Sequence, residues 1–432
     1  MAENVREIVL DTLLSLERGE ALSHNVLKAV LDKYDFLDGR DKAFIKRLTE
    51  GVLERKIELD YYLDEYSSVP VRKMKPFIRC LMRMGVYQIV YMDSVPDSAA
   101  VNEACKLAGK RKFQNLKGFV NAVLRKVSAG KSALPLPDDR TEPVKYLQVK
   151  YSMPEWIVMQ WLSRYGREGT EKILEGMLRI HPVSLRFRKD LDDKTKDKIL
   201  GKIKEQGVEL HQSSLLPYIY LAYHLEGVEN LPGYAEGYFV VQDASSAMAV
   251  EAADIAPDDF VMDICAAPGG KTMLAAEMAK KVLARDVSEP KTARIQENLE
   301  RMRLGNVQVE VWDATVPDER FLETADVVFM DVPCSGLGVM GKKRDIKYHV
   351  SPQSLAEITA LQKSIVENSW RYVKPGGTLL YSTCTINPAE NEEMVQWICE
   401  RFPFSIDKEG VQLLPGFQET DGFFFAKLRR ER

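Results

Sequence analysis

The sequence predicts a multidomain protein with an all-α bundle, a small α/β middle domain and a C-terminal doubly wound α/β domain. Three observations lead to this prediction. The length of 432 residues corresponds to about two to four domains of ordinary size. Apolar residues recur with helical spacing in the first part of the chain, where no β-hairpin signal occurs. The last part, from residue 236 on, alternates short apolar strands with helices.

The composition excludes several classes of protein. Hydrophobic residues make up 45% and charged residues 29%, as in soluble globular proteins, which excludes general disorder. The chain lacks an apolar run of the roughly 18 residues that a membrane helix needs, and its N-terminus lacks the apolar core of a secretory signal. We therefore expect a cytoplasmic protein without membrane contact. The formal net charge of −4 indicates that any nucleic-acid surface is a local patch.

The first domain is predicted to be a helical bundle over residues 1–129. Val5, Val9 and Leu13 lie four residues apart, and a longer apolar helix follows Pro76. Short apolar helices of this kind bury their apolar faces against one another.

Basic residues of this domain concentrate in two runs without acids, at 67–92 and 104–137. A charge run is often only a solvated helix face. Two such runs in an acidic protein favour phosphate binding instead. The candidates in the second run are Lys110, Arg111 and Lys112.

A segment rich in proline, small residues and charge, 130–142, is predicted to be a linker. Residues 143–235 mix helical and strand patterns and are predicted to form the small α/β domain. The periodicity predicts a helix over 155–178, a strand over 183–187 and a helix over 194–206.

The C-terminal domain, 236–432, is predicted to be Rossmann-like. The pattern predicts strands at 260–264, 282–284, 307–311, 327–330, 378–381 and 422–428. It predicts helices at 273–279, 291–302, 354–372 and 392–401. This alternation is typical of a parallel sheet covered by helices on both faces.

A glycine-containing turn follows the first of these strands, where doubly wound folds bind nucleotides. It comprises Cys265, Ala266, Ala267, Pro268, Gly269, Gly270 and Lys271. A phosphate-binding P-loop would require glycine at position 265, and the dinucleotide-binding pattern is also absent.

Acidic residues follow the strands of the predicted crevice. Asp286 lies 23 residues after Asp263, where an acid commonly binds a ribose diol, and Asp313 follows the third strand. A crevice that has carboxylates but no lysine and glycine arrangement for binding phosphate suits a nucleoside with a positive centre and no phosphate. S-adenosylmethionine is a ligand of this kind. The alternative is that these are ordinary aspartates at strand ends.

Two cysteines follow neighbouring strands at the same edge of the sheet. Asp331 ends the fourth strand, Cys334 lies in the loop after it, and Cys384 follows the fifth strand. The strands are expected to be adjacent, so both thiols are expected to face one site, which indicates nucleophilic chemistry. No Cys-x-x-Cys pair occurs, so we expect no metal and no disulfide framework.

Three strings carry a family resemblance: Asp-Ile-Cys-Ala-Ala-Pro-Gly-Gly-Lys-Thr at 263–272, Asp-Val-Pro-Cys-Ser-Gly at 331–336, and Ser-Thr-Cys-Thr at 382–385. In this order they resemble the RNA cytosine-5 methyltransferases. The helical first domain resembles the RNA-binding antitermination factor NusB. Together they resemble the bacterial RsmB (Sun/Fmu) family of 16S ribosomal RNA cytosine-5 methyltransferases.

The resemblance implies a covalent mechanism. Cys384 would attack carbon 6 of the cytosine, Cys334 would assist release, and Asp331 would contact ring N3. The loop 265–271 with Asp286, Asp313 and Asp331 would line the S-adenosylmethionine pocket. DNA cytosine-5 methyltransferases attack with the Pro-Cys thiol instead, and the sequence alone leaves that exchange of roles open.

The resemblance also implies a basic loop that contacts RNA after the Pro-Cys motif. Related enzymes usually carry Arg-Arg-x-Pro-Asp there, whereas this chain has Lys342, Lys343 and Arg344 followed by Asp345, without the proline. The charge is retained, but the path of the loop is not fixed by the motif.

The partner implied is 16S ribosomal RNA, bound by a monomer. Two other functions are compatible with parts of the sequence. One is a non-catalytic RNA-binding or assembly factor, against which the two crevice thiols argue. The other keeps the chemistry but acts on transfer RNA or DNA.

Overall fold

The computed structural model describes residues 4–19, 23–225 and 227–432. The chain forms two compact units. The first, here called the helical unit, comprises Met1–Glu175 and Lys343–His349; the second, the sheet unit, comprises Gly176–Lys342 and Val350–Arg432. Among the described residues, no helix is both long and apolar enough to cross a membrane.

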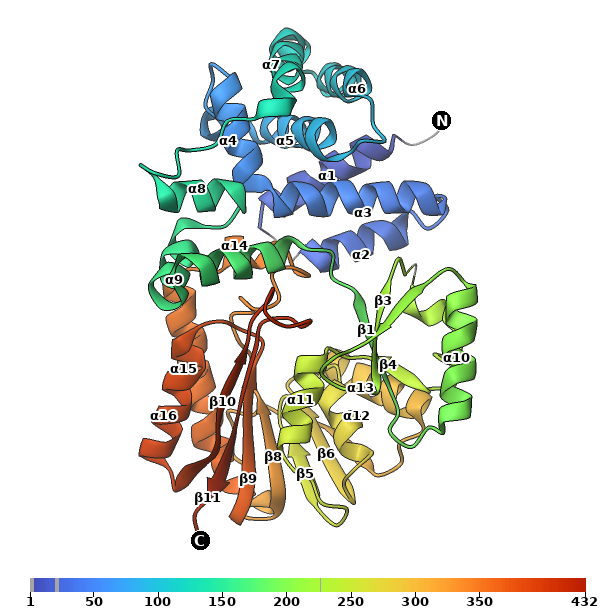
Figure 1. Ribbon diagram of the computed structural model, residues 1–432, viewed down its shortest axis with the longest axis vertical. Helices are drawn as coiled ribbons and strands as arrows, with labels where there is room; N and C mark the ends of the chain where they lie inside the picture. The colour runs from blue at the N-terminus through green and yellow to red at the C-terminus, as the bar shows by residue number, and fades with distance from the viewer. Residues whose placement is uncertain (1–3, 20–22, 226) are drawn as a thin grey trace. The chain divides into compact units, whose positions relative to one another are not determined.

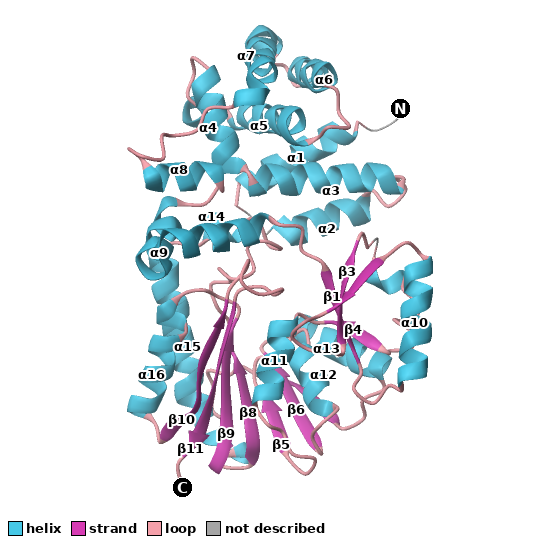
Figure 2. Ribbon diagram, in the orientation of Figure 1, coloured by secondary structure: helices cyan, strands magenta, loops and turns pink. Residues whose placement is uncertain are grey.

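The helical unit is built from α-helices joined by short turns (Figures 1 and 2). They are α1 (Val5–Glu17), α2 (Ser23–Lys33), α3 (Gly39–Glu54), α4 (Lys56–Tyr66), α5 (Pro76–Tyr91), α6 (Asp97–Lys110), α7 (Lys117–Gly130), α8 (Pro143–Lys150), most of α9 (Glu155–Leu178) and α14 (Ile346–His349). The predicted helical bundle is confirmed. Helix α9 is interrupted at Gly166, whose φ of 65° is left-handed.

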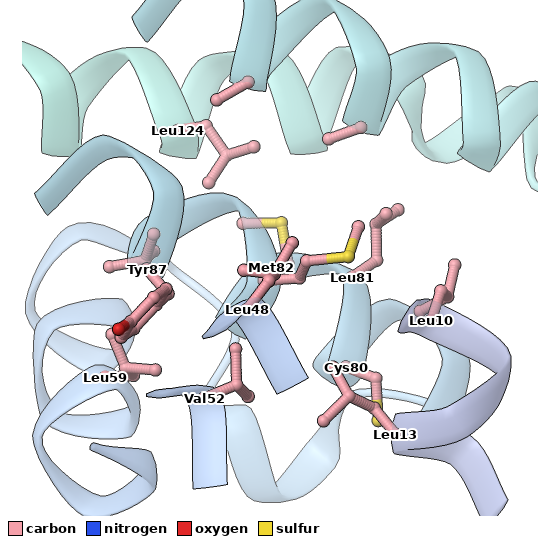
Figure 3. Close-up of a cluster of buried hydrophobic side chains, with 14 of the residues drawn as sticks. Leu10, Leu13, Leu48, Val52, Leu59, Cys80, Leu81, Met82, Tyr87 and Leu124 are labelled. Atoms are coloured by element: carbon pink, nitrogen blue, oxygen red, sulfur yellow. The ribbon is translucent and has the colours of Figure 1, made fainter. Parts of the chain in front are cut away.

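The core of the helical unit surrounds α5, which packs against α1, α3, α4, α6 and α7. Figure 3 shows side chains of this core, among them Leu10, Leu48 and Leu124. Gly85 lets α5 and α7 approach closely, because a Cβ at that position would lie 2.8 Å from the Leu124 side chain. The apolar periodicity of the sequence thus marks residues that are buried in one shared core.

The units divide the chain at other positions than the sequence suggested. Residues 143–175 were expected in the middle domain, but they cluster with the helical unit. Ser152, which follows α8, accepts a hydrogen bond from the N–H of Ile57 at 3.0 Å. The proposed boundary at 235 also falls before β4, the strand that completes the small sheet. The predicted domain bounds therefore differ from the compact units and stay predictions.

The sheet unit contains two sheets (Figure 2). Its strands are β1 (Val183–Phe187), β2 (Glu209–Gln212), β3 (Ile219–Tyr223), β4 (Phe239–Val241), β5 (Phe260–Asp263), β6 (Lys281–Asp286), β7 (Val307–Val311), β8 (Ala325–Asp331), β9 (Val373–Thr383), β10 (Phe404–Leu413) and β11 (Phe423–Arg430). Its helices are α10 (Asp193–Glu205), α11 (Ala244–Ala252), α12 (Gly270–Ala276), α13 (Glu289–Met302), α15 (Pro352–Ser369) and α16 (Glu392–Arg401).

The small sheet has the order β2-β3-β1-β4 with antiparallel pairs. The large sheet has the order β10-β11-β9-β8-β5-β6-β7, in which β9 to β7 are parallel. The predicted parallel sheet is confirmed, and an antiparallel hairpin of β10 and β11 extends it.

Alternate residues of the central strands pack against helices on the two faces of the large sheet. In β8, Val328 and Met330 pack on the side of α15 and α16, whereas Val327 and Phe329 pack on the side of α11 and α12 (Figure 1). The parallel strands therefore all end at one edge, and the loops that follow them meet there.

Candidate active site

Two sulfur atoms meet where neighbouring strands end. Strands β8 and β9 are adjacent and parallel, with Asp331 opposite Ser382. Cys334 lies three residues beyond the first strand end, and Cys384 directly follows the second. Their Sγ atoms are 3.2 Å apart. Strand adjacency thus brings together two thiols that are 50 residues apart in the sequence.

Hydrogen bonds hold the two cysteine loops against each other. The hydroxyls of Ser335 and Thr385 lie 2.7 Å apart, and Gly338 donates its N–H to the carbonyl of Cys384 at 3.1 Å. Gly338 has no space for a side chain, since a Cβ would lie 1.9 Å from the carbonyl oxygen of Gly422. Hydrogen bonds and close backbone packing therefore both fix the relative position of the thiols.

The surroundings of Cys334 raise the pKa of its thiol. The hydrogen bond with Cys384 and burial raise the pKa of Cys334 well above its usual range, and the nearby negative charge of Glu390 acts in the same direction. Burial and these neighbours therefore favour the protonated thiol of Cys334.

The carboxylate of Asp331 is fixed beside the thiols. It accepts hydrogen bonds from Lys271 Nζ and from Ser382 Oγ, each at 2.7 Å. Lys271 is buried, and its ammonium also lies 4.9 Å from the ring centre of Phe423. The positive charge of Lys271 is thus directed to Asp331.

The glycine-containing turn links β5 to α12. Its bend uses Gly269, whose φ is 102°, and the Ala267–Pro268 peptide is cis. Asp263 is fully buried below the turn and accepts a hydrogen bond from the hydroxyl of Thr272 at 2.7 Å. Burial raises the pKa of Asp263 to about 7. It also raises the pKa of Cys265, so this third thiol is not poised as a nucleophile.

A cavity of about 430 Å³ opens beside the thiols. Both sulfurs line it, together with three carboxylates from successive strand ends, those of Asp286, Asp313 and Asp331. The carboxylate of Asp286 accepts the N–H of Ala267 at 2.9 Å and so fixes the turn at the cavity. The three aspartates and the cysteine loops thus form one site.

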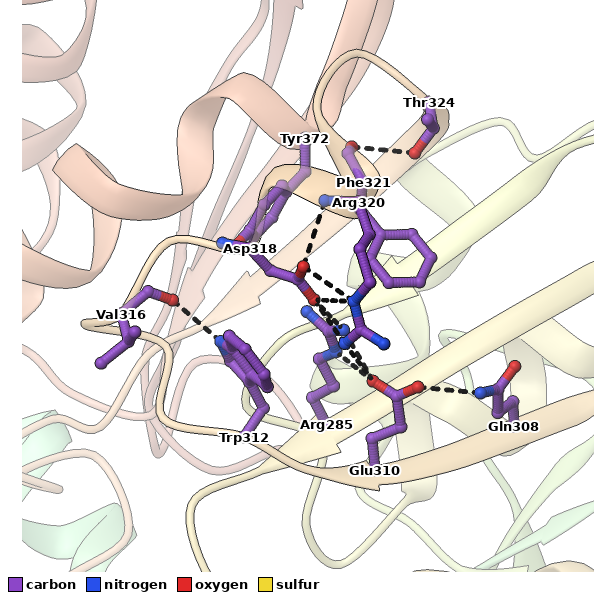
Figure 4. Close-up of polar contacts among 10 residues, drawn as sticks. All are labelled: Arg285, Gln308, Glu310, Trp312, Val316, Asp318, Arg320, Phe321, Thr324 and Tyr372. Carbon is purple, nitrogen blue, oxygen red and sulfur yellow. Dashed lines mark hydrogen bonds and ion pairs between the residues drawn. The ribbon is translucent and has the colours of Figure 1, made fainter.

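A polar network outside the cavity positions part of its wall (Figure 4). Buried Arg285 donates to Glu310 and Asp318, at 2.6 Å each, and its guanidinium lies 4.9 Å from the ring centre of Trp312. Hydrogen bonds from Arg320 and Arg285 hold the pKa of Asp318 far below its ordinary value. The network fixes Trp312, which lines the cavity.

Comparisons with known proteins agree over both parts of the chain. The model of the 16S rRNA methyltransferase RsmB/F family matches residues 250–429, and that of the NusB family matches 3–129. The probable ribosomal RNA small subunit methyltransferase B of Bacillus subtilis is 33% identical, with 99% of each chain covered. This chain belongs to the ribosomal RNA small subunit methyltransferase B family.

One further relative fits this assignment, and one solved structure shares the fold. The ribosomal RNA small subunit methyltransferase B of Salmonella typhi is 32% identical, with 98% of each chain covered. A solved methyltransferase homologue from Pyrococcus horikoshii shares the fold with a TM-score of 0.57 at 23% identity, over 67% of this chain and 99% of its own.

The family uses S-adenosylmethionine, and the site has the chemistry to hold it. The cavity has the size of an ordinary ligand site. Its three carboxylates meet two ammoniums, that of Lys291 at Asp286 and that of Lys271 at Asp331, so the site keeps a negative charge suited to a cationic ligand. Asp313 Oδ1 accepts from Thr315, and Oδ2 has no hydrogen bond to the described residues.

The residues of the glycine-containing turn are divided between two cavities. Cys265 and Ala267 line the 430 Å³ cavity. A second cavity of about 190 Å³ is lined by Ala266, Pro268, Gly270 and Lys271, and by Cys265 and Ala267 as well. Gly269 shapes the bend without lining either one. Their contact with the methyl donor stays a prediction.

The basic residues predicted to bind RNA in the helical unit have acidic neighbours in space. Lys110 pairs with Glu7 at 2.5 Å, and Arg111 pairs with Glu7 and with Asp11. The run without acids in the sequence thus meets the acids of α1. Lys112 is exposed at the end of α6 and makes no ion pair with the described residues. RNA contact by these residues stays a prediction.

The basic segment after the Pro-Cys loop is divided between the units. In the sheet unit, Lys342 lies between Asp243 and Asp421, at 3.1 and 2.8 Å. From Lys343 the segment belongs to the helical unit, where Arg344 pairs with Glu50 and Glu54. RNA contact by Lys342, Lys343 and Arg344 therefore also stays a prediction.

Buried contacts fix the path of this segment in the helical unit. Lys347 donates to the carbonyls of Glu54 and Ser152, at 2.7 and 2.6 Å, and burial lowers its pKa to about 7. Asp345 accepts the N–H of Ser23 at 2.6 Å. These contacts order the segment without the proline found in related motifs.

Sequence reasoning missed the cavity residues Trp312, Lys291 and Ile365. Trp312 precedes Asp313, and Lys291 lies five residues after Asp286, so proximity to a strand end was the available signal. Ile365 lies inside α15, where a cavity-lining residue has the same pattern as any core residue.

Proposed function

We propose that this protein transfers a methyl group from S-adenosylmethionine to carbon 5 of a cytosine in 16S ribosomal RNA, through a covalent adduct with Cys384. The observation that carries the proposal is the 3.2 Å separation of the Cys334 and Cys384 sulfurs at the wall of the 430 Å³ cavity. The names of the family and of the relatives support the ribosomal substrate.

Cys384 is assigned as the nucleophile because it is the cysteine of the Ser-Thr-Cys-Thr string at 382–385, which resembles the motif of the RNA cytosine-5 methyltransferases. Carbon 5 of cytosine is a poor nucleophile until a thiolate adds to carbon 6 and makes the ring electron-rich. The bound methyl donor supplies an electrophilic methyl group to that carbon. The thiol of Cys334 is within hydrogen-bond distance of the attacking sulfur and can steady its negative charge.

Cys334 completes the reaction as a base. Once Cys384 is bonded to carbon 6, its negative charge is gone, and Cys334 can release its own proton to solvent. The Cys334 thiolate then takes the proton from carbon 5, and the bond between Cys384 and carbon 6 breaks. The net change replaces the carbon 5 hydrogen by methyl and releases one proton.

Asp331 is assigned the role of binding the N3 edge of the pyrimidine ring. Its carboxylate is held by Lys271 and Ser382 at the cavity that the thiols line. An acceptor fixed in this way can bind ring N3 when that atom is protonated in the adduct and so stabilise it. The base must first leave its stack, at a cost of about a few kcal/mol, which is smaller in an RNA loop.

A non-catalytic RNA-binding factor is disfavoured by the same geometry. Binding RNA requires no pair of thiols beside a ligand cavity. The acidic cavity wall would also repel phosphate, which indicates that the site holds a cationic ligand and a base rather than the RNA backbone.

The proposal is tested by methyl transfer from labelled S-adenosylmethionine to deproteinised small-subunit RNA, with transfer RNA and DNA as competing substrates. Mass mapping should then find 5-methylcytosine at one position of the small-subunit RNA, absent from cells without the gene. Labelling of transfer RNA or DNA alone would reject the ribosomal substrate, and methylation at another atom would reject the carbon 5 chemistry.

A further inference from the structure

We propose that Glu390 is a positioning residue that holds the Cys334 loop against the Cys384 loop and keeps Cys334 in its proton-bearing role. This inference rests on the proposed function, because it assigns Cys334 a proton-transfer step. Glu390 lies in the 3₁₀ turn Pro388–Glu390, six residues after Cys384, and outside the residues that line the 430 Å³ cavity.

Both oxygens of the Glu390 carboxylate accept hydrogen bonds, although the residue is fully buried. Oε2 accepts the N–H of Ser335 at 2.8 Å and the amide of Gln362 at 3.0 Å. Oε1 accepts the hydroxyl of Ser335 and the amide of Asn387, the latter at 2.9 Å. Burying a charge is costly unless it is hydrogen-bonded in this way, so the contacts account for its presence.

The same contacts fix the residues before and after Cys334 in the chain. On one side, Gln362 donates to the carbonyl of Pro333 at 2.9 Å while also donating to Glu390. On the other side, the N–H of Ser335 is bound to Glu390. The peptide groups on both sides of Cys334 are thus fixed to one carboxylate and its partner amide.

The network continues to the other cysteine loop. The hydroxyl of Ser335, bound to Glu390, lies 2.7 Å from that of Thr385, the residue after Cys384. Tyr381, three residues before Cys384, donates its hydroxyl to the carbonyl of Glu390 at 2.7 Å. Glu390 therefore joins the two loops that carry the sulfurs.

The charge of Glu390 has a second effect. A buried negative charge beside a thiol disfavours the thiolate. The other groups that face Cys334 are Cys384 after β9, Tyr381 on β9 and Asp331 at the end of β8, whose charge is offset by Lys271. Glu390 is thus the carboxylate near Cys334 that lacks a cationic partner among the described residues.

The test compares Glu390→Gln with Glu393→Gln, the same change at an exposed position of α16. Alkylation of each cysteine is followed by peptide mapping from about pH 7 to 11 in the full-length protein, without RNA or methyl donor. Loss of the charge should lower the pH midpoint of Cys334 alkylation by about one unit, which is about tenfold more thiolate at a given pH below the midpoint. Cys399 on α16 serves as an internal reference.

Loosening of the fold alone would raise the reactivity of several cysteines at every pH without moving the midpoint of one. A Cys334 midpoint unchanged between the two variants would overturn the proposal. If Glu390→Gln does not fold, Glu390→Asp tests the positioning role instead. This variant keeps the negative charge, but its shorter side chain cannot reach all four hydrogen-bond donors. We therefore expect kcat to fall while KM for S-adenosylmethionine is unchanged. An unchanged kcat would overturn the positioning role.

The outcome is separable from that of the proposed function. A shifted Cys334 midpoint in a protein that methylates none of the tested nucleic acids would reject the proposed reaction and keep the link between Glu390 and Cys334. An active enzyme whose Cys334 midpoint does not respond to Glu390→Gln would keep the reaction and reject the link.

Discussion

The ammonium of Lys271 lies 2.7 Å from Oδ2 of Asp331 and joins the start of α12 to the end of β8. The lysine is only 8% exposed, whereas the aspartate side chain keeps 28% of its surface open to solvent. The pair therefore fixes a carboxylate that is still accessible to a substrate.

Replacing Asp331 by Asn should remove methyl transfer and also destabilise the protein. The buried ammonium of Lys271 would lose its charged acceptor, which costs about 1–3 kcal/mol in the free energy of unfolding. Lys271→Met together with Asp331→Asn should cost less than the sum of the single changes, because the charge is then gone. Denaturant titration measures this difference. Additive losses would show that the two side chains do not interact.

The two cysteines should give opposite results when each is changed to Ala. Cys384→Ala should abolish methyl transfer and form no covalent RNA complex. Cys334→Ala should accumulate a covalent RNA complex, because attack proceeds while release fails. Denaturing gels with labelled RNA measure both, and Cys399→Ala serves as the control. A covalent RNA complex formed by Cys384→Ala would indicate that the roles of the two thiols are the reverse of those proposed.

Stability should decrease as the pH rises through the range in which Asp263 ionises. The folded-state pKa of about 7 exceeds the ordinary carboxyl value of 3.8, so the group stabilises the fold below about pH 4 and loses that contribution as the pH rises through 7. The change is at most about 4 kcal/mol. Asp263→Asn should lack this pH dependence, whereas Asp258→Asn, at an exposed position, should keep it. Thermal melts from pH 4 to 8 would measure it, and parallel curves for all three proteins would contradict it.

Changing Lys110, Arg111 and Lys112 to Ala should weaken RNA binding and flatten its salt dependence. Each phosphate contact contributes about 0.7 to the slope of log affinity against log salt for a single strand. Because Lys110 and Arg111 are paired with acids, the loss should be smaller than three full contacts. Filter binding at several salt concentrations measures it. An unchanged slope would indicate that this basic run is only a solvated helix face.

The parallel strands and their end loops could be predicted from the sequence because both rest on local patterns. Apolar runs marked β5 to β9, and in a parallel sheet each strand end leads to the same edge. The expected adjacency of β8 and β9 then predicts that Cys334 lies near Cys384. The confirmed helix over 155–178 also followed from periodicity, although its break at Gly166 did not.

Features that depend on distant partners could not be predicted. Strand β10 is a charged edge strand with irregular pairing, so it shows little of the apolar alternation that reveals a half-buried strand. The pairing of Arg111 with Asp11 joins residues 100 positions apart. No sequence pattern indicated that Glu390 is buried, because the residue type alone does not distinguish a buried carboxylate from an exposed one.

The segment 343–349 restricts how this protein can be taken apart. The chain leaves the helical unit after Glu175, returns to it at Lys343 and departs again after His349. A fragment ending at Glu175 would deprive the carbonyls of Glu54 and Ser152 of their ammonium donor. Exchanging the N-terminal module between relatives therefore means transplanting two separate stretches of the gene, one of which is embedded in the coding region of the catalytic portion.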